Sequence, residues 1–484
     1  MMKRKLHILV LCLFGLAYWL FLAIGYHGHL HAAEGDSIFL FTPDYAADTL
    51  LRPGGAANYL GDFIVQFFHL PWIGALLVAL LLTGLAAAVA SFRRSDALLP
   101  LALVPSLAYA VLLCDAKWTI AGLAGLTAAV AIAAAIARIR VPGLRIAAAL
   151  MALPLTVWMF LLPQFYIYLK APAGLYAGLV LLTAAICVLL ALVKAPTPKT
   201  WISGTAYVLL LALCAFGISR KYERLDEEID RYVFLVRTSD WDGILRKAGK
   251  EELHSPLSTN AVNLALEMEG RLGEEMFRFY QRGGRSLINF EEKKMSSEIL
   301  FRLGFVNEAT HMAFEDMAAN PSRKRGVYHL TRLARFTAVD SCNRRLTGKY
   351  LATLDRTLFY RHFNPQTGVR SEMEPPADFL FNYGDFQAML EKLAEQRPDN
   401  APVRNYLAAS YLLTKNLQPF EDRFADEPNP PAAHREALQM IHTLRDGASY
   451  PQLQQYIDAY GRARGKESGM GRYANTYWYY YNFR

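Results

Sequence analysis

The sequence predicts an all-α protein, in which a bundle of seven membrane-spanning helices is followed by a water-soluble domain of helical repeats. Seven apolar stretches fill the first half of the chain, and the second half has almost none. Basic residues flank these stretches, and the second half has helical periodicity with few strand signals. We therefore expect a transmembrane domain over residues 1–219 and an extracytoplasmic helical domain over residues 220–484.

The seven apolar stretches are each long enough to cross a bilayer, whose core of about 30 Å requires about 20 residues of helix. The first follows Lys3, Arg4 and Lys5 and could be a signal peptide. Its apolar core is longer than the ~7–15 residues of a signal peptide, and no A-x-A site follows, so we predict an uncleaved anchor. The predicted spans are 7–26, 73–92, 97–114, 119–137, 146–166, 172–193 and 201–219.

The basic residues between the spans predict the orientation, because Lys and Arg accumulate in cytoplasmic loops. With a cytoplasmic N-terminus, the short outer loops hold only Arg52, Lys117 and Lys170. The cytoplasmic side then holds ten: Lys3, Arg4, Lys5, Arg93, Arg94, Arg138, Arg140, Arg145, Lys194 and Lys199. An odd number of spans places the second half outside the cytoplasm. The span centres carry no Asp, Glu, Lys or Arg, which argues against an ion-coupled transporter.

Small residues recur at four-residue spacing in two spans, and this spacing allows helices to approach closely. One series consists of Gly125, Ala129, Ala133 and Ala137, and another of Gly84 and Ala88. They could form a dimer seam or pack within the bundle, and we expect packing within the bundle.

The long first outer loop, residues 27–72, contains a Pro-Gly-Gly turn at 53–55 and then a helical apolar pattern. We predict a helix over 56–69 that lies in the membrane interface or against the bundle, with Asp62 and Gln66 facing water. Its apolar face consists of Leu60, Phe63, Ile64, Phe67 and Phe68.

The same loop holds the candidate site residues. Asp44 and Asp48 are four positions apart, and such carboxylates can act as a general base or bind a metal. They can equally cap a helix, since Asp44 follows Pro43. We take both as catalytic candidates, with Arg52 and His69 as candidates for substrate binding.

The sequence provides no signal for a cofactor, a metal site or nucleic-acid binding. The alternating His27, His29 and His31 could bind a transition metal, but we expect a polar juxtamembrane segment. No G-x-S-x-G, H-E-x-x-H or P-loop motif is present in the second half. The chain ends in an aromatic run over 477–483, which could dock to a partner or seal the last helix pair, and we expect the second.

The second half resembles tetratricopeptide repeats in degenerate form. Gly304, Ala309 and Pro321 have the spacing of a turn glycine, a small helix residue and a closing proline. After Pro398, three residues match the first helix of a repeat, and three others match more weakly. These are Leu407, Ala408 and Tyr411, and then Val262, Gly270 and Phe279. The repeat expects a late alanine where the chain has Asp316.

Two segments carry a wider resemblance, FTPDYxxDxLxRPGGxxxYLxxFxxQFFxxPWxG in the first loop and NLALExxGRLGEEMF in the second half. They resemble an uncharacterised bacterial membrane-protein family, which implies a Gram-negative inner membrane. The first loop is also similar to that of GT-C type glycosyltransferases. This second resemblance implies a polyprenyl-linked sugar donor and Asp44 as base, although Tyr45 stands where those enzymes have a second acid.

These observations leave three functions open, of which a transporter is the least favoured because the spans carry no charge. The first is an envelope protein whose periplasmic helical domain binds a partner protein. The alternative is a glycosyltransferase acting on a lipid-linked sugar.

Overall fold

The computed structural model describes residues 2–162, 173–196, 199–319, 326–339, 343–367, 369 and 381–484, so Lys170 and Pro321 lie outside the described residues. Over these residues the secondary structure is helical, apart from one isolated bridge between Arg282 and Gly284. The chain forms two compact units. The membrane unit contains residues 1–227, 319–330 and 351–363, and the helical unit contains 228–318, 331–350 and 364–484.

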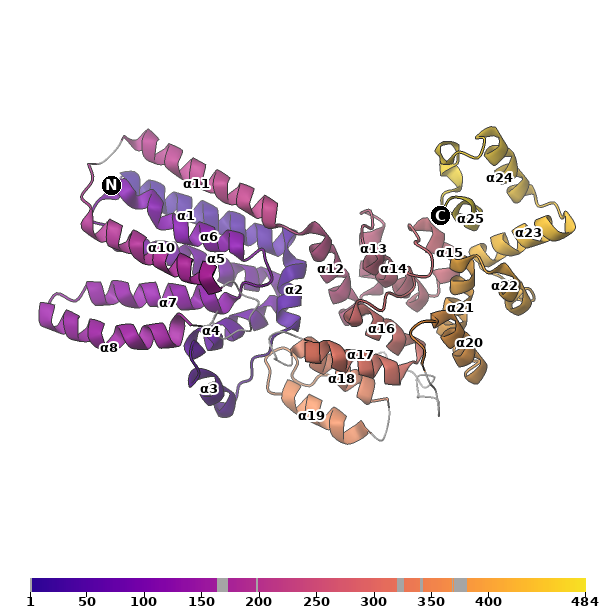
Figure 1. The fold of residues 1–484 in the computed structure, drawn as a ribbon, viewed down its shortest axis with the longest axis horizontal. Helices are drawn as coiled ribbons and strands as arrows, with labels where there is room; N and C mark the ends of the chain where they lie inside the picture. Colours follow the sequence, from indigo (N-terminus) through magenta and orange to yellow (C-terminus); the bar gives the residue numbers. More distant parts are fainter. Residues whose placement is uncertain are drawn as a thin grey trace. The chain divides into compact units, whose positions relative to one another are not determined.

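Six of the seven predicted stretches form helices that are long and apolar enough to cross a membrane. The first is α1 (Met2–Leu20), which continues through a π-helical turn to Gly25. The others are α5 (Pro71–Ala90), α7 (Ile120–Ala137), α8 (Pro142–Phe160), α10 (Ala173–Leu192) and α11 (Thr200–Lys221). Figure 1 shows these helices running alongside one another in the membrane unit.

The remaining predicted stretch, 97–114, forms a composite helix. A 3-10 helix (Asp96–Leu103) leads into α6 (Val104–Leu112). Pro100 lies inside the 3-10 helix, and a proline has no N–H to continue an α-helical ladder. α6 contacts α5, α10 and α11, and Tyr109 and Ala110 on it are fully buried. This segment therefore lies in the core of the bundle.

The start of α1 and the end of α5 meet at one end of the bundle. Arg4 and Arg93 each approach the carboxylate of Asp96 at 3.3 Å. The N–H of Arg94 donates to the carbonyl of Leu190, near the end of α10, at 2.9 Å. Basic residues from two separate stretches thus gather at this end.

The opposite end is marked by Tyr26, just beyond the π-helical turn. Its hydroxyl donates to the carbonyl of Cys114 at 2.8 Å. The hydroxyl of Tyr222, just after α11, donates to the carbonyl of Gly25 at 3.3 Å. The segment from Asp96 to Cys114 therefore runs beside α1 from its beginning to its end, and α11 ends at the Tyr26 end.

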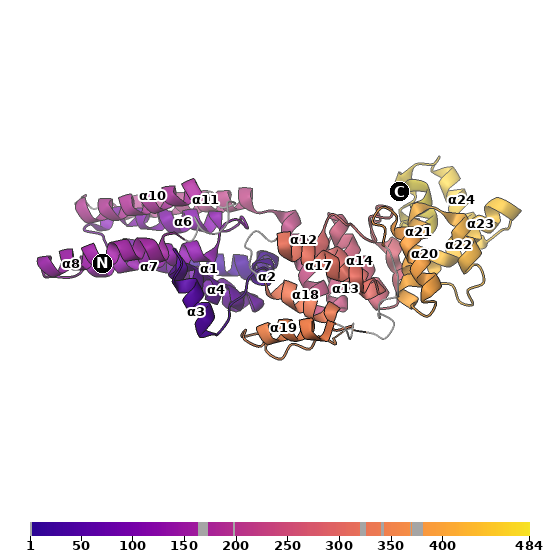
Figure 2. The ribbon, with the colours of Figure 1, turned by 60° about the horizontal axis from the view of Figure 1, so that its bottom comes forward.

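In the helical unit, helices that follow one another in the chain pack on one another (Figure 2). α13 (Trp241–Ala248) packs on α14 (Pro256–Met268). Five helices follow further along the chain, and each of the first four packs on the next. They are α20 (Phe386–Gln396), α21 (Ala401–Thr414), α22 (Leu417–Phe424), α23 (Ala432–Asp446) and α24 (Pro451–Arg462). This contact between chain neighbours is the pattern of helical arrays.

Several residues singled out by the repeat spacing are buried. Gly304 ends α16 (Lys293–Leu303) with a φ of 98°, a left-handed conformation that glycine adopts without strain. Ala309 and Ala408 have no exposed surface, and Leu407 and Tyr411 are almost fully buried. These positions are therefore buried within the helical unit.

Two ion pairs lie inside the helical unit. Asp316, which replaces the alanine expected of a repeat, accepts a hydrogen bond of 2.6 Å from Arg332. Glu298 on α16 accepts one of 3.2 Å from Arg335, and the side chain of Glu298 has no exposed surface. Buried charges are tolerated when they are paired in this way.

The aromatic run at the end of the chain forms α25 (Tyr477–Phe483), which packs against α23. Tyr477, Trp478 and Tyr480 are buried. The carboxylate of Glu436 accepts a hydrogen bond of 2.6 Å from the N–H of Tyr477. The run therefore seals the last helices of the unit rather than forming an exposed strip.

Burial raises the pKa of Glu436 to about 7, against an ordinary value of 4.5. The folded state then holds a proton that the unfolded state has released, so this group's stabilisation falls as the pH rises from about 4.5 to 7. We expect α25 to be held less tightly at pH 8 than at pH 5, by about 1–3 kcal/mol. Glu436→Gln should remove this difference, which hydrogen exchange of the α25 amides at both pH values would measure. An unchanged difference in the variant would contradict the assignment.

Candidate functional site

The loop over residues 27–72 folds into a set of short helices at the Tyr26 end of the bundle. They are α2 (His27–Gly35), α3 (Pro43–Leu50), α4 (Gly55–Val65) and a 3-10 turn (Gln66–His69). The helix predicted over 56–69 is confirmed as α4 with this turn. α4 packs on α7 so closely that a Cβ on Gly61 would lie 2.6 Å from the Cα of Ala121.

The predicted orientation of α4 is wrong for Asp62. Asp62 is 9% exposed and accepts a hydrogen bond of 2.8 Å from the hydroxyl of Tyr45, whereas Leu60 and Phe63 on the apolar face are 40% and 36% exposed. Gly61 allows α4 to contact α7, and α3 brings Tyr45 over the side that was predicted to face water. The hydrogen bond from Tyr45 makes burial of this carboxylate tolerable.

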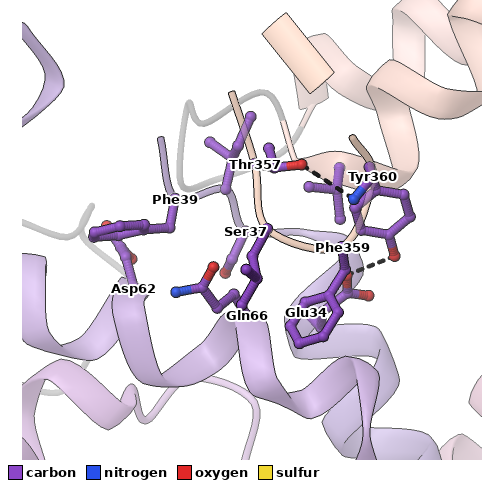
Figure 3. A pocket seen from close by; sticks show the side chains of 11 residues that line it. Glu34, Ser37, Phe39, Asp62, Gln66, Thr357, Phe359 and Tyr360 are labelled. Atoms are coloured by element: carbon purple, nitrogen blue, oxygen red, sulfur yellow. Dashed lines mark hydrogen bonds between the residues drawn. The ribbon is translucent and has the colours of Figure 1, made fainter. Parts of the chain in front are cut away.

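A small cavity of about 10 Å³, enough for about one water molecule, lies in this part of the membrane unit. Its walls come from the first loop and from two distant segments, around residue 327 and over 357–360. The N–H of Val327 donates to the carbonyl of Ser37, and the N–H of Phe41 donates to the carbonyl of Arg356, both at 3.0 Å. The polar side chains of the lining are Glu34, Ser37, Asp62, Gln66, Thr357 and Tyr360 (Figure 3).

Glu34, Tyr360 and His69 are linked by hydrogen bonds at this cavity. The hydroxyl of Tyr360 donates to the carboxylate of Glu34 at 2.6 Å, as Figure 3 shows. Nδ1 of His69 lies 3.3 Å from the same hydroxyl, and the ring of His69 stacks on Phe359. If Tyr360 donates to Glu34, its oxygen accepts from His69, which then carries its proton on Nδ1. The carboxylate of Glu34 is thus part of an ordered chain of polar groups.

Helix α2 places Glu34 in the cavity, and Glu227 holds the other end of this helix. The two carboxylate oxygens of Glu227 accept hydrogen bonds of 2.9 Å from the N–H groups of Gly28 and His29. The N–H groups in the first turn of a helix have no acceptor within the helix, and Glu227 supplies one here. The N-terminus of a helix also attracts negative charge. Burial lowers the pKa of His29 in the same turn, which keeps its ring neutral.

The Asp44, Asp48 and Arg52 side chains lie elsewhere on the loop. Thr42 caps α3, and its side chain accepts a hydrogen bond from the N–H of Tyr45. Asp44 is in the first turn of this helix, where a carboxylate is favoured by the helix dipole. All three side chains are exposed and do not line the cavity, whereas His69 reaches Tyr360 beside it.

The site presents oxygen atoms in a partly enclosed space. Burial and the carboxylate of Asp62 raise the pKa of Tyr45 well above its ordinary value, so its hydroxyl remains a donor to Asp62. Carboxylates in such a setting can accept hydrogen bonds from the hydroxyl or ammonium groups of a ligand, and a carboxylate within reach of a hydroxyl can act as a general base.

Glu34, Asp62 and Tyr360 are the site residues that the sequence reasoning missed. The periodicity of 56–69 assigned Asp62 to the water-facing side, and no spacing relates Glu34 to Tyr360, which follows it by 326 residues. His69 was predicted as a polar neighbour of Asp44, and in the structure its ring lies beside Tyr360.

No curated protein and no solved structure matches this chain. A family model does match, over residues 2–484, and it is described as a family of unknown function, DUF6057. Because the match covers nearly the whole chain, the protein, whose described residues fold into helices and include six apolar spans, belongs to the DUF6057 family.

Proposed function

We propose that this chain is a bacterial inner-membrane protein that crosses the bilayer seven times. The N-terminus is cytoplasmic, and the helical unit is periplasmic. The support is the gathering of Arg4, Arg93 and Arg94 at one end of the bundle, since basic residues accumulate on the cytoplasmic side. α11 ends at the other end, beside Gly25, and leads towards the helical unit.

The composite helix Asp96–Leu112 is the crossing that is added to the six long helices, and it is the third in chain order. Its 3-10 part rises about 2 Å per residue and its α part about 1.5 Å, so the two together extend about 30 Å, the thickness of a bilayer core. The contacts of Asp96 with Arg4 and of Cys114 with Tyr26 support a path from one face to the other.

A pair of fusions after Arg484 tests this orientation. Alkaline phosphatase should be active there and GFP should be dark, because the first requires the periplasm and the second the cytoplasm. A dark phosphatase with a fluorescent GFP would overturn the topology.

The helical unit, on this proposal, is a tetratricopeptide-like binding domain that recruits a partner protein in envelope assembly. The observation that carries this function is the packing of each helix on the next from α20 to α24. Helical arrays of this kind present extended surfaces on which partners dock.

Site-specific photo-crosslinking in the intact envelope tests this function. A photoreactive residue would be scanned across the exposed positions of the helical unit, including Leu444 and Ile457, with Met151 on the apolar α8 as a control. We expect one discrete protein adduct from neighbouring positions of the unit and lipid adducts from Met151. A scan that yields no protein adduct would refute the binding function.

The cavity favours a second candidate function, a GT-C type glycosyltransferase that uses a polyprenyl-linked sugar. Such an enzyme needs a base near the membrane surface, and two carboxylates of the first loop, Glu34 and Asp62, line one cavity. Asp44 is the base that the sequence favours, with Asp48 and Arg52 on the same exposed part of the loop. Glu34 is the competing base, because Tyr360 holds it in place.

Membrane vesicles containing the chain and a radiolabelled polyprenyl-phosphate sugar would distinguish the two bases. Loss of a general base lowers a rate by about 10²–10⁴. Asp44→Asn should cause this loss if Asp44 is the base, and Glu34→Gln should cause it if Glu34 is. Transfer that is absent in the wild type, or unchanged in both variants, would remove the glycosyltransferase candidate.

A further inference from the structure

A group of cations surrounds an exposed tyrosine in the helical unit. Tyr280 is 49% exposed, and the guanidinium carbons of Arg282 and Arg484 lie 4.9 Å and 5.0 Å from the centroid of its ring. Attraction between each cation and the ring stabilises this arrangement. It nevertheless brings two positive charges to one side chain.

Lys415 adds a third cation. It follows α21 with a φ of 59°, and its ammonium lies 5.5 Å from the centroid of the Tyr481 ring. The same group donates a hydrogen bond of 3.4 Å to the carbonyl of Arg484. We call Tyr280, Arg282, Lys415 and Arg484 the Tyr280 surface. Its residues come from three distant parts of the chain, so its charge is produced by the fold.

Two acceptors of the chain itself already contact cations of this surface: Glu467 pairs with Arg484, and an oxygen of Arg484, the last residue, accepts from Lys415. Glu467 accepts a hydrogen bond of 2.5 Å from Arg484. Nη2 of Arg282 donates to the carbonyl of His254 at 3.3 Å, whereas its Nη1 is shielded from water and has no hydrogen-bond partner among the described residues. Because its contacts among the described residues are neutral groups, the positive charge of Arg282 is not balanced by a carboxylate there.

We infer that the Tyr280 surface binds an acidic segment of a partner protein, whose carboxylates pair with Arg282 and Lys415. This inference rests on the proposed partner-binding function and names the chemistry of the partner. A guanidinium fork matches a carboxylate in geometry, which favours acidic side chains. An anionic membrane surface is disfavoured, because a few cations alone attract it weakly, and Tyr477, Trp478 and Tyr480 beside this surface are buried and add no apolar insertion.

The test uses the full-length chain in nanodiscs of phosphatidylcholine and a fluorescent hexaglutamate peptide, with hexaglutamine as the control peptide. Fluorescence anisotropy would measure the affinity. Arg282→Ser should weaken hexaglutamate binding about tenfold, since one charge-assisted pair is lost. Lys415→Gly should also weaken it without harming the fold, because glycine adopts a φ of 59° without strain.

Two further variants test the specificity of the surface. Arg462→Ser removes an exposed arginine elsewhere in the unit and should leave the affinity unchanged. Glu467→Gln should strengthen binding, because Arg484 then loses its internal partner. Equal losses for Arg282→Ser and Arg462→Ser, or no binding of hexaglutamate, would overturn the inference.

Recruitment of phosphatidylglycerol vesicles without hexaglutamate binding would also overturn it and would assign the surface to the membrane. Failure of the inference can be separated from failure of the proposed function. Protein adducts in the crosslinking scan without hexaglutamate binding would reject only the acidic partner. Hexaglutamate binding without any protein adduct would reject the partner-binding function.

Discussion

Arg335→Met is expected to destabilise the helical unit by about 3–5 kcal/mol, because it leaves the carboxylate of Glu298 buried without its cation. Glu298 has no exposed side-chain surface, so water cannot replace the lost partner. Hydrogen exchange of the α16 amides in the full-length chain should accelerate by at least about a hundredfold.

The matched control is the double variant Arg335→Met/Glu298→Leu. Replacing both partners with apolar residues removes the unpaired charge, and such replacements are often close to neutral. We expect the double variant to recover most of the lost protection. If it exchanged as fast as Arg335→Met, the ion pair would not be the cause of the effect.

Gly125→Ala is expected to destabilise the membrane unit by about 1–3 kcal/mol or more, because the new methyl group has no space. A Cβ at this position would lie 2.0 Å from the backbone oxygen of Phe160 and 2.9 Å from the Cβ of Ala57. Backbone atoms cannot rotate away, so α7 would have to separate from α8 and α4. The midpoint of thermal unfolding in detergent should fall.

Gly84→Ala is the control for this substitution, because Gly84 also belongs to a small-residue series in a span. The nearest atom to a Cβ there is Cγ2 of Thr127 at 3.9 Å, which is an ordinary contact. Alanine is the better helix former by roughly 0.5–1 kcal/mol, so this variant should be as stable as the wild type or more so. A similar loss in both variants would contradict the packing explanation.

The spans could be predicted from sequence because each depends on about 20 consecutive residues and one physical requirement, solubility in lipid. The composite helix at Asp96–Leu112 shows the limit of this rule, since Pro100 changes the helix type without changing the apolarity. Ala309 and Ala408 were predicted as buried because small residues at regular spacing have few uses outside helix contacts.

The cavity could not be predicted because its walls come from segments separated by some 300 positions in the chain. Which side of α4 is buried depends on Gly61, which admits α7, and on Tyr45, which covers Asp62. Neither contact can be inferred from the apolar periodicity of residues 56–69. The loop 27–72 was identified as the site region by its length and polar residues, but its buried carboxylates required the fold.

Helix α2 has a consequence for how the membrane unit responds to force. Its first amides are clamped by Glu227, and its last turn carries Glu34 into the cavity. Between these two points there is a single rigid rod of about 13 Å. Glu227 lies six residues beyond the end of α11. A displacement of Glu227 would therefore shift the whole of α2 and move the carboxylate of Glu34 relative to Tyr360. Tension on the chain after α11 would thus change the shape of the cavity that Glu34 and Tyr360 line.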